Sequence, residues 1–289
     1  MYSDRQNRID DLFAPLEREP AALEVQHDGA VHRIWRLTDE KTQAQLADIL
    51  AIGRIYLADG HPELEAMLAL REELAADKPA DSALHFGPMY LCNEDDSALI
   101  GLGIHRVLFG LPAFNRETML RSARDYFTVA EGPLSGPDAL RPALLGQSKR
   151  GPAFAVVVPG LPKVAFLRIR ADLIKASMPQ LAESRARGEL DVTHLHGLIF
   201  NEIFGLAPGA ENAHLRYSHD WEEAFAELSK PEVQAVFFMN PAKLELLRAV
   251  VDEGVSMPDH STWFHPRFPP GLVSDPIDVA ETVRVPSPY

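Results

Sequence analysis

The segment from Ala153 to Arg170, which reads AFAVVVPGLPKVAFLRIR, decides the fold class. Its two halves, Ala153–Val158 and Lys163–Arg170, are rich in β-branched and other apolar residues, and Pro159–Pro162 lies between them. Two such runs joined by a short stretch with Gly and Pro predict an antiparallel hairpin. We therefore expect the fold to contain an antiparallel sheet.

Further strands are expected on both sides of this hairpin. Leu23–Gln26 and Val31–Leu37 flank His27-Asp28-Gly29, and an Asp-Gly turn between β-prone runs indicates a second hairpin. A third is expected where Met89–Cys92 and Leu99–Ile104 flank the acidic turn Asn93–Asp96. Two short buried strands are also predicted, at Arg54–Ala58 and Ala235–Met239.

Helices are expected between these strands. Thr38 or Asp39 is a suitable cap for a helix through Leu46 and Leu50, and Pro62 suits the first position of another. The other predicted helices are Glu117–Tyr126, Asp191–Leu206 and a helix capped by Asn240, with Pro241 in its first turn, that ends at Gly254. Residues Glu131–Pro152, rich in Gly and Pro, are expected to form a loop.

Hairpins mixed with strand–helix units predict an α+β fold with a mixed, mainly antiparallel sheet and flanking helices. Leu111-Pro112 is interpreted as a boundary, which gives a first part at residues 1–112 and a second at 113–274. Residues 275–289, with few apolar anchors, are expected to be an irregular tail.

Composition limits the classes of function. The net charge of −14 opposes binding to DNA or to an anionic membrane, so neither a nucleic acid nor a membrane is an expected partner. No apolar run reaches the roughly eighteen residues of a membrane span, and the N-terminus is polar. A lone cysteine, Cys92, fits a reducing compartment. A cytoplasmic location is therefore expected.

The stretch Tyr56-Leu57-Ala58-Asp59-Gly60-His61-Pro62-Glu63 is the first candidate site. Backbone N–H groups at the start of a helix form an anion site, and the helix dipole adds to it. Asp59 is suited to take a proton or bind a metal, and His61 to donate to a phosphate oxygen. The structural alternative is a tight turn in which His61 covers the helix end.

Several stretches resemble motifs of the bacterial family known as domain of unknown function 1015, and the resemblance covers nearly the whole chain. Tyr56–Glu63 is similar to the family's Ala-Asp-Gly-His-His-Arg motif. The C-terminal stretch Met257–Val273 resembles Met-Pro-x-Lys-Ser-Thr-Tyr-Phe-Tyr-Pro-Lys-x-x-x-Gly-Leu-Val. The remaining matches are His32-Arg33-Ile34-Trp35, Ile104–Leu108 with Gly110-Leu111-Pro112, Leu195-His196 and Phe237–Pro241.

The family motif also resembles the helix start of the partition-protein and sulfiredoxin superfamily, which includes kinases of free serine. The resemblance implies phosphorylation of a small hydroxyl compound with ATP or ADP and Mg²⁺. It assigns catalytic roles to Asp59, His61 and His105, and phosphate binding to a second set. That set is Gly60, Arg106, Ser261, Thr262 and Arg267.

Departures from the family pattern predict an impaired site. Pro62-Glu63 stands where the family has His-Arg, and His260 where it has Lys, so two cations are lost. The family's lead segment with its Lys-His-Glu motif is also expected to be missing, as in a truncated chain. The alternative function is therefore a pseudoenzyme, a non-catalytic binding or regulatory relative of an intact paralogue.

His194 and His196 are the remaining candidates for a metal pair. They lie in the predicted helix, where two residues two positions apart point about 200° away from each other. We therefore expect no metal site there, and we expect His196 to contact the core or the family's cleft.

Overall fold

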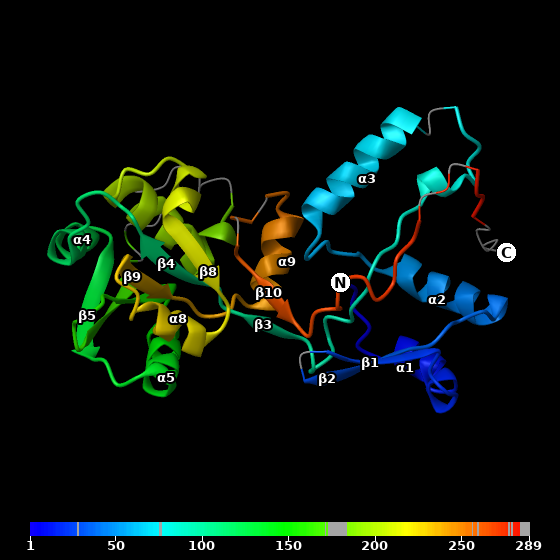
Figure 1. Cartoon of the computed structure of the whole chain (residues 1–289), viewed down its shortest axis with the longest axis horizontal. Helices are drawn as coiled ribbons and strands as arrows, with labels where there is room; N and C mark the ends of the chain where they lie inside the picture. Colours follow the sequence, from blue (N-terminus) through cyan, green and yellow to red (C-terminus); the bar gives the residue numbers. More distant parts are fainter. Residues whose placement is uncertain are drawn as a thin grey trace. The chain divides into compact units, whose positions relative to one another are not determined.

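The computed structural model describes residues 1–27, 29–74, 77–170, 172, 184–255, 257–258, 260–276, 278 and 280–283. The chain divides into two compact units (Figure 1). Unit 1 comprises Met1–Leu99 and Pro266–Tyr289, and unit 2 comprises Ile100–His265. Because unit 1 contains both ends of the chain, unit 2 is an insertion between its two segments.

Unit 2 is built on an antiparallel sheet. Within the described residues the sheet has six strands in the order β5-β7-β6-β9-β4-β8. The strands are β4 (His105–Phe109), β5 (Phe127–Pro133), β6 (Ala153–Val157), β7 (Lys163–Ile169), β8 (Leu215–Ser218) and β9 (Val233–Phe238). The hairpin predicted from AFAVVVPGLPKVAFLRIR is confirmed as β6 and β7, and Val157 pairs with Val164. Val233–Phe238 likewise confirms the strand predicted at Ala235–Met239.

Helices cover both faces of this sheet, because successive residues of its buried strands point to opposite sides. Phe237 packs into one apolar cluster and its neighbour Phe238 into the other. The first cluster includes side chains of α4 (Arg116–Ala123), the π-helix η5 (Leu195–Ile203) and α9 (Leu244–Asp252). The second includes α5 (Pro137–Ser148) and α8 (Trp221–Glu227), which lie together on one side of the sheet in Figure 1.

Shorter elements complete unit 2. The predicted helix at Asp191–Leu206 is confirmed as α7 (Asp191–His194) continued by η5, and its apolar side chains enter the first cluster. Two 3₁₀ turns, η4 (Arg187–Glu189) and η6 (Ala210–His214), stand before and after it. The short strands β3 (Ile100–Leu102) and β10 (Trp263–His265) form a separate antiparallel ribbon.

Unit 1 has helices and one hairpin with little buried apolar surface. Its elements are α1 (Arg8–Phe13), η1 (Leu16–Arg18), β1 (Leu23–His27), β2 (Ala30–Ile34), α2 (Glu40–Ile52), α3 (His61–Leu74) and η2 (Ala83–His85). The hairpin predicted around Asp28-Gly29 is confirmed, with His27 opposite Ala30. Asp39 is confirmed as the cap of α2, since its carboxylate accepts a hydrogen bond from Thr42 N at 2.8 Å.

The α+β class with an antiparallel sheet is confirmed, and the α4 prediction is correct to within a few residues. The units meet in sequence at Leu99/Ile100 and His265/Pro266, whereas the predicted boundary followed Pro112. A compact unit is not by itself an independently folding domain, so the division into residues 1–112, 113–274 and 275–289 stays a prediction.

Two strand predictions in the first hundred residues are wrong. Residues 54–58 are irregular, with Ile55 and Leu57 exposed, and Tyr56 exchanges backbone hydrogen bonds with the terminal residue Met1 instead of joining a described strand. Residues 89–92 are likewise outside any strand, and Ile100–Leu102 pairs with Trp263–His265 instead. The strand at Ile100–Leu102 thus pairs with a segment far away in the sequence and not with the neighbouring residues 89–92, and no local pattern indicates such a partner.

Two predictions near Pro residues are also wrong. The expected loop at Glu131–Pro152 contains the end of β5 and all of α5, whose first residue is Pro137 and whose Leu140 and Leu144 pack against the sheet. Asn240 does not cap a helix, since α9 starts at Leu244. The Asn240 side chain instead donates from Nδ2 to Ser148 Oγ at 2.5 Å.

Candidate functional site

The start of α3 in unit 1 carries the predicted motif Asp59-Gly60-His61. Gly60 has φ of +81°, a conformation that favours glycine, and its carbonyl accepts the first helical hydrogen bond from Leu64 N at 3.0 Å. His61 is the exposed first residue of the helix. A Cβ added at Gly60 would lie 3.7 Å from Glu63 Oε2, so the carboxylate of Glu63 is close to the turn. The first turn of α3 therefore already carries a carboxylate, that of Glu63.

Arg267 forms an ion pair with Asp59, donating from Nη2 to the Asp59 carboxylate. The two residues are 208 positions apart in the sequence, and both were predicted site residues. Both side chains are about half exposed, at 47% for Arg267 and 65% for Asp59. Unit 1 thus places a predicted acid and a predicted cation in direct contact.

Arg106 is the predicted phosphate ligand of unit 2, and the structure buries it. Its residue is 1% exposed, in strand β4. The guanidinium donates to the carbonyl oxygen of Ile104, to the carbonyl oxygen of His260 at 2.7 Å, and to His196 Nε2 at 3.3 Å. Burial lowers the pKa of Arg106 to about 10, which leaves the group charged at neutral pH.

His196 links Arg106 to an acid. Because Arg106 Nε donates to Nε2 of His196, the ring carries its hydrogen on Nδ1 and donates to Glu211 Oε1 at 3.1 Å. Burial, followed by the charge of Arg106, lowers the pKa of His196 to about 4. The result is a chain of three polar groups, Glu211–His196–Arg106, with a neutral imidazole in the middle.

Two aromatic rings lie beside the Glu211–His196–Arg106 network. The Tyr217 ring lies under the guanidinium, with Arg106 Cζ 5.5 Å from the ring centroid. The exposed His260 stacks on Tyr217, with 3.8 Å between the ring centroids, and has φ of +52°. His260 occupies the position where the family resemblance has Lys. Here it contributes a backbone carbonyl to Arg106 and a stacked ring to Tyr217.

His105 is fully buried at the start of β4. Its Nδ1 accepts a hydrogen bond from Met239 N at 3.1 Å, and its ring packs against Trp221 and Phe238 at 4.5 and 5.1 Å between centroids. Burial, and then the charge of Arg106, lowers the pKa of His105 to about 3. These contacts are those of a neutral core residue, and a catalytic role for His105 stays a prediction.

Ser261 and Thr262 lie just before β10, both partly buried. The Ser261 hydroxyl donates to the carbonyl oxygen of Pro258. Because the carbonyl oxygen of His260 accepts a hydrogen bond from Arg106, the segment that contains Ser261 lies beside the Arg106 guanidinium in unit 2. Asp59, Gly60, His61 and Arg267 belong to unit 1.

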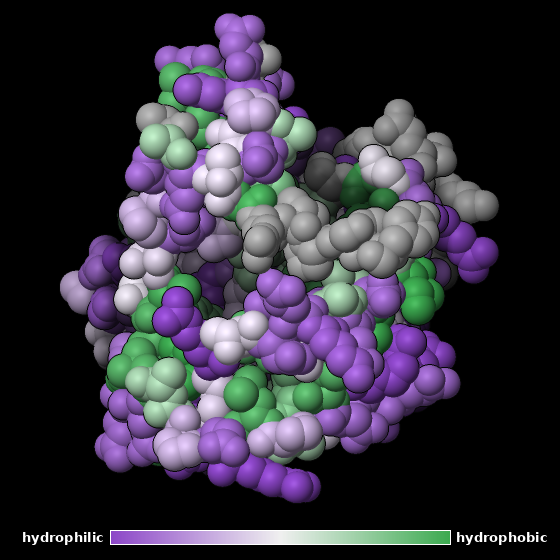
Figure 2. All heavy atoms as spheres, turned by 90° about the vertical axis from the view of Figure 1, so that its right-hand side faces the viewer, coloured by the Kyte–Doolittle hydropathy of each residue, from purple (hydrophilic) through white to green (hydrophobic). Residues whose placement is uncertain are grey.

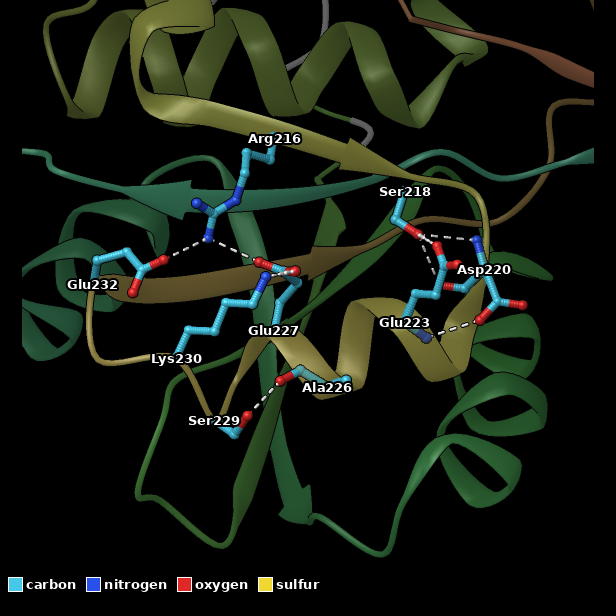
Figure 3. A network of polar contacts seen from close by, with 9 residues as sticks. All are labelled: Arg216, Ser218, Asp220, Glu223, Ala226, Glu227, Ser229, Lys230 and Glu232. Atoms are coloured by element: carbon cyan, nitrogen blue, oxygen red, sulfur yellow. Dashed lines mark hydrogen bonds and ion pairs between the residues drawn. The ribbon is translucent and has the colours of Figure 1, made fainter.

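A second charged network lies on β8 and α8 (Figure 3). Arg216 donates to Glu227 Oε2 at 2.8 Å and to Glu232 Oε1 at 3.2 Å, and Glu227 also accepts from Lys230. Asp220 caps α8 by accepting from Glu223 N at 2.8 Å. The side chains of this network pair with one another, and the contact of Arg216 with Glu227 joins β8 to α8.

Sequence reasoning missed the role of Glu211 and placed His196 only against the core or a cleft. His196 and Glu211 are 15 positions apart, and Arg106 and His196 are 90 apart. Glu211 lies in a 3₁₀ turn after the loop Ala207–Gly209, where no periodic pattern marks it as buried. The neighbouring His194 contacts a different group, the Gly188 carbonyl oxygen, at 2.8 Å from its Nε2.

In the part of the chain that the structure describes, no group of three or more His, Cys, Asp or Glu side chains is arranged to hold a metal ion. No helix in this part combines the length and apolar character that crossing a membrane requires.

Comparison with known proteins identifies the family. The family model described as "Protein of unknown function (DUF1015)" matches residues 1–193, so this chain belongs to that family. No curated protein matches. A solved structure, "Free serine kinase in complex with AMP", is similar at 15% sequence identity and a TM-score of 0.32, covering 88% of this chain and 79% of its own.

Proposed function

We propose that this chain is a non-catalytic, ligand-binding relative of kinases that phosphorylate small hydroxyl compounds, with its phosphate-binding groups engaged by its own side chains. The ion pair between Arg267 and Asp59 is the observation that carries the proposal. Free serine is the substrate suggested by the family resemblance, and the name of the solved neighbour is consistent with it. A binding or regulatory role beside an active paralogue follows.

Electrostatics at the start of α3 support this proposal. Arg267 is already paired with Asp59, and Glu63 lies beside Gly60 where the family resemblance has a cation. A phosphate at the backbone amides would therefore meet two carboxylates. One charge pair at about 5 Å and an effective dielectric near 20 is worth roughly 3 kcal/mol before solvent screening. The exposure of these groups reduces that value but leaves its sign unchanged.

The arrangement around Arg106 supports the same conclusion for unit 2. Its guanidinium contacts three acceptors of the protein and is surrounded by Tyr217 and His196. A phosphate would have to replace the carbonyl oxygens of Ile104 and His260, and leaving the buried Ile104 acceptor unpaired costs about 1–3 kcal/mol. Arg106 is therefore a structural cation in this proposal.

An active kinase is the second candidate, and one observation favours it. Asp59 and Arg267 come from opposite ends of the sequence and lie in contact, as a catalytic acid–base group and a phosphate ligand of one site would. ATP or ADP with Mg²⁺ would be the cofactor, and Asp59 would supply a carboxylate ligand for the metal or accept the substrate proton. In this reading the ion pair opens when nucleotide binds.

Calorimetry with ATP and ADP in Mg²⁺, together with a turnover assay on a panel of hydroxy amino acids, separates the two candidates. We expect no turnover and weak binding by the wild type. Glu63→Arg should tighten nucleotide binding about tenfold, because it replaces a repulsive charge with an attractive one. Glu73→Arg is the matched control, since it makes the same change near the far, C-terminal end of α3.

Turnover by the wild type would contradict the non-catalytic proposal and support the second candidate. Tight wild-type binding that Glu63→Arg and Glu73→Arg leave equally unchanged would contradict both the blocked phosphate site and its position at α3.

A further inference from the structure

Unit 2 contains an open pocket of about 570 Å³ that belongs to none of the site residues discussed so far. Three segments form its walls: the end of α5 with the turn before β6, the residues around the start of α7, and the chain from the end of β9 into α9. The apolar lining residues are Pro152, Ala153, Leu190, Pro241, Ala242, Leu246 and Ala249.

Asp191, the first residue of α7, lines this pocket. Its Oδ1 accepts a hydrogen bond from Val192 N at 2.9 Å, and the backbone N–H of Asn240 also bonds to the carboxyl group. Two backbone N–H groups, one in α7 and one in the segment after β9, thus orient the carboxyl group, and the positive charge of Arg106 acts on it as well. A carboxyl held this way is a preorganised acceptor for a ligand.

The charge around the pocket is acidic. Glu189, Asp191 and Glu245 line it together with a single base, Lys243. Asn240 donates its Nδ2 to Ser148, which leaves its amide oxygen as a further acceptor at the same wall. A cation with several N–H donors complements such a set of acceptors, whereas an anion meets repulsion.

Asp191 is also poorly solvated. Burial is the main cause that raises its pKa to about 7, despite the backbone hydrogen bonds and the charge of Arg106, which act in the opposite direction. An ionised carboxylate in such surroundings is stabilised by an additional positive charge nearby. The pocket can admit a ligand that provides one.

We propose that this pocket binds a small organic cation, a primary ammonium on an apolar body, with the ammonium group on Asp191. The apolar walls cover the body, and Asn240 accepts a second hydrogen bond from the ammonium. This site goes beyond the proposed function, because it lies in unit 2 and takes a cation, while the phosphate site is in unit 1.

Benzylamine is a suitable probe, with benzyl alcohol and benzoate as neutral and anionic compounds of similar size. Binding is measured by calorimetry on the full chain at pH 6 and pH 8. The charged groups nearest Asp191 are Arg106, which acts on it from β4, and Glu189, Lys243 and Glu245, which line the same pocket. Because only ionised Asp191 binds the ammonium, benzylamine should bind about tenfold more tightly at pH 8.

Asp191→Asn should abolish both the binding of benzylamine and its dependence on pH. Glu245→Gln is the matched control: it removes an acid of the same pocket, and should weaken binding less than about threefold while keeping the pH dependence. Proton release on binding, measured in two buffers of different ionisation enthalpy, gives an independent test on the wild type if Asp191→Asn does not fold.

Three results would overturn the proposal: equal binding of benzyl alcohol and benzylamine, affinity that falls between pH 6 and pH 8, or unchanged binding by folded Asp191→Asn. Nucleotide binding at unit 1 is a separate measurement, so a failure of either proposal is distinguishable from a failure of the other.

Discussion

The two units of the chain differ in where their charge and apolar surface lie. Unit 1 has eleven basic and twenty-three acidic residues, a formal charge of −12, whereas unit 2 has seventeen and nineteen, a charge of −2. Unit 2 has apolar clusters on both faces of its sheet. In unit 1 the buried apolar side chains among the described residues are Ile9, Leu84 and Pro269.

Unit 1 contains instead a cluster of buried polar groups around Asp4 and Asn93. Asp4 accepts hydrogen bonds from Ile9 N at 2.9 Å and Arg8 Nε at 3.0 Å, and Asn93 bonds to the Asp4 backbone on both sides. Burial acts to raise the pKa of Asp4, but these hydrogen bonds outweigh it and the pKa is lowered. Several apolar side chains of unit 1 are correspondingly exposed. On the face that Figure 2 shows, hydrophobic patches lie between hydrophilic ones.

This difference teaches that overall composition does not locate the core. Helices α2 and α3 have no buried residue, and Ile52 is 76% exposed, although the sequence pattern predicted both helices. Hydrophobic burial is the main favourable term of folding. We therefore expect unit 2 to account for most of the stability of the chain.

The largest contrast is expected between two arginines. Arg106→Ala removes a buried cation and leaves the carbonyl oxygens of Ile104 and His260 unpaired, so unit 2 should lose about 3–5 kcal/mol of unfolding free energy. Arg267→Ala removes an exposed ion pair and should cost less than about 1 kcal/mol. Urea denaturation measures both, and equal losses would contradict the contrast.

The second contrast concerns the stability of the two units at acidic pH. The pKa of His105 is lowered to about 3 in the folded state, so its contribution to stability is present above pH 6.5 and is lost as the pH falls below it. Unit 2 should lose up to about 1.4 kcal/mol per pH unit from this group. Asp4 of unit 1 has a lowered carboxyl pKa, so its contribution is lost only below about pH 4.

Urea unfolding at a series of pH values tests this prediction, with His105→Asn as the variant. The asparagine amide oxygen can still accept from Met239 N, but the residue no longer titrates. The variant should lose less stability than the wild type between pH 6.5 and 4.5. An identical pH dependence of the two proteins would show that His105 is not the cause.

The third contrast compares two glycines with negative φ. A Cβ at Gly103 would lie 2.4 Å from the Met239 carbonyl oxygen and 2.9 Å from Asn240 C, both backbone atoms. Gly103→Ala should therefore destabilise unit 2 by about 1–3 kcal/mol, the range for overpacking. Gly53→Ala of unit 1 meets nothing within 4 Å and should change stability by less than about 1 kcal/mol. Thermal unfolding of both variants gives the comparison.

The smallest effects are expected from two helix caps. Asp39 of α2 and Asn115 of α4 each accept a hydrogen bond from the N–H three residues on, at 2.8 and 2.9 Å. Replacing either by Ala should cost about 1 kcal/mol of helix stability. Because α4 packs in the core and α2 does not, Asn115→Ala should lower the melting temperature of the chain. Asp39→Ala should mainly increase amide hydrogen exchange within α2.

Residue spacing alone predicted the elements that depend on near neighbours. The β6–β7 hairpin, the β1–β2 hairpin, the Asp39 cap and the helix from Asp191 follow from turn residues, capping groups and periodicity, which act over a few positions. The candidate residues Asp59, Arg106 and Arg267 were also selected from the sequence. None of their contacts was predicted, and the pairing of Asp59 with Arg267 is known only from the structure.

Only the tertiary structure decided which residues meet and which are buried. Arg106 of β4 contacts His196 and the carbonyl of His260, 90 and 154 positions away. His196 reaches it because η5 packs on the same face of the sheet as Leu108 of β4. Asp191 lines its pocket beside Asn240 for a similar reason, since chain segments far apart in the sequence pack together in unit 2. Such contacts follow from the way helices and strands pack on one another, which the pattern of a single strand or helix does not specify.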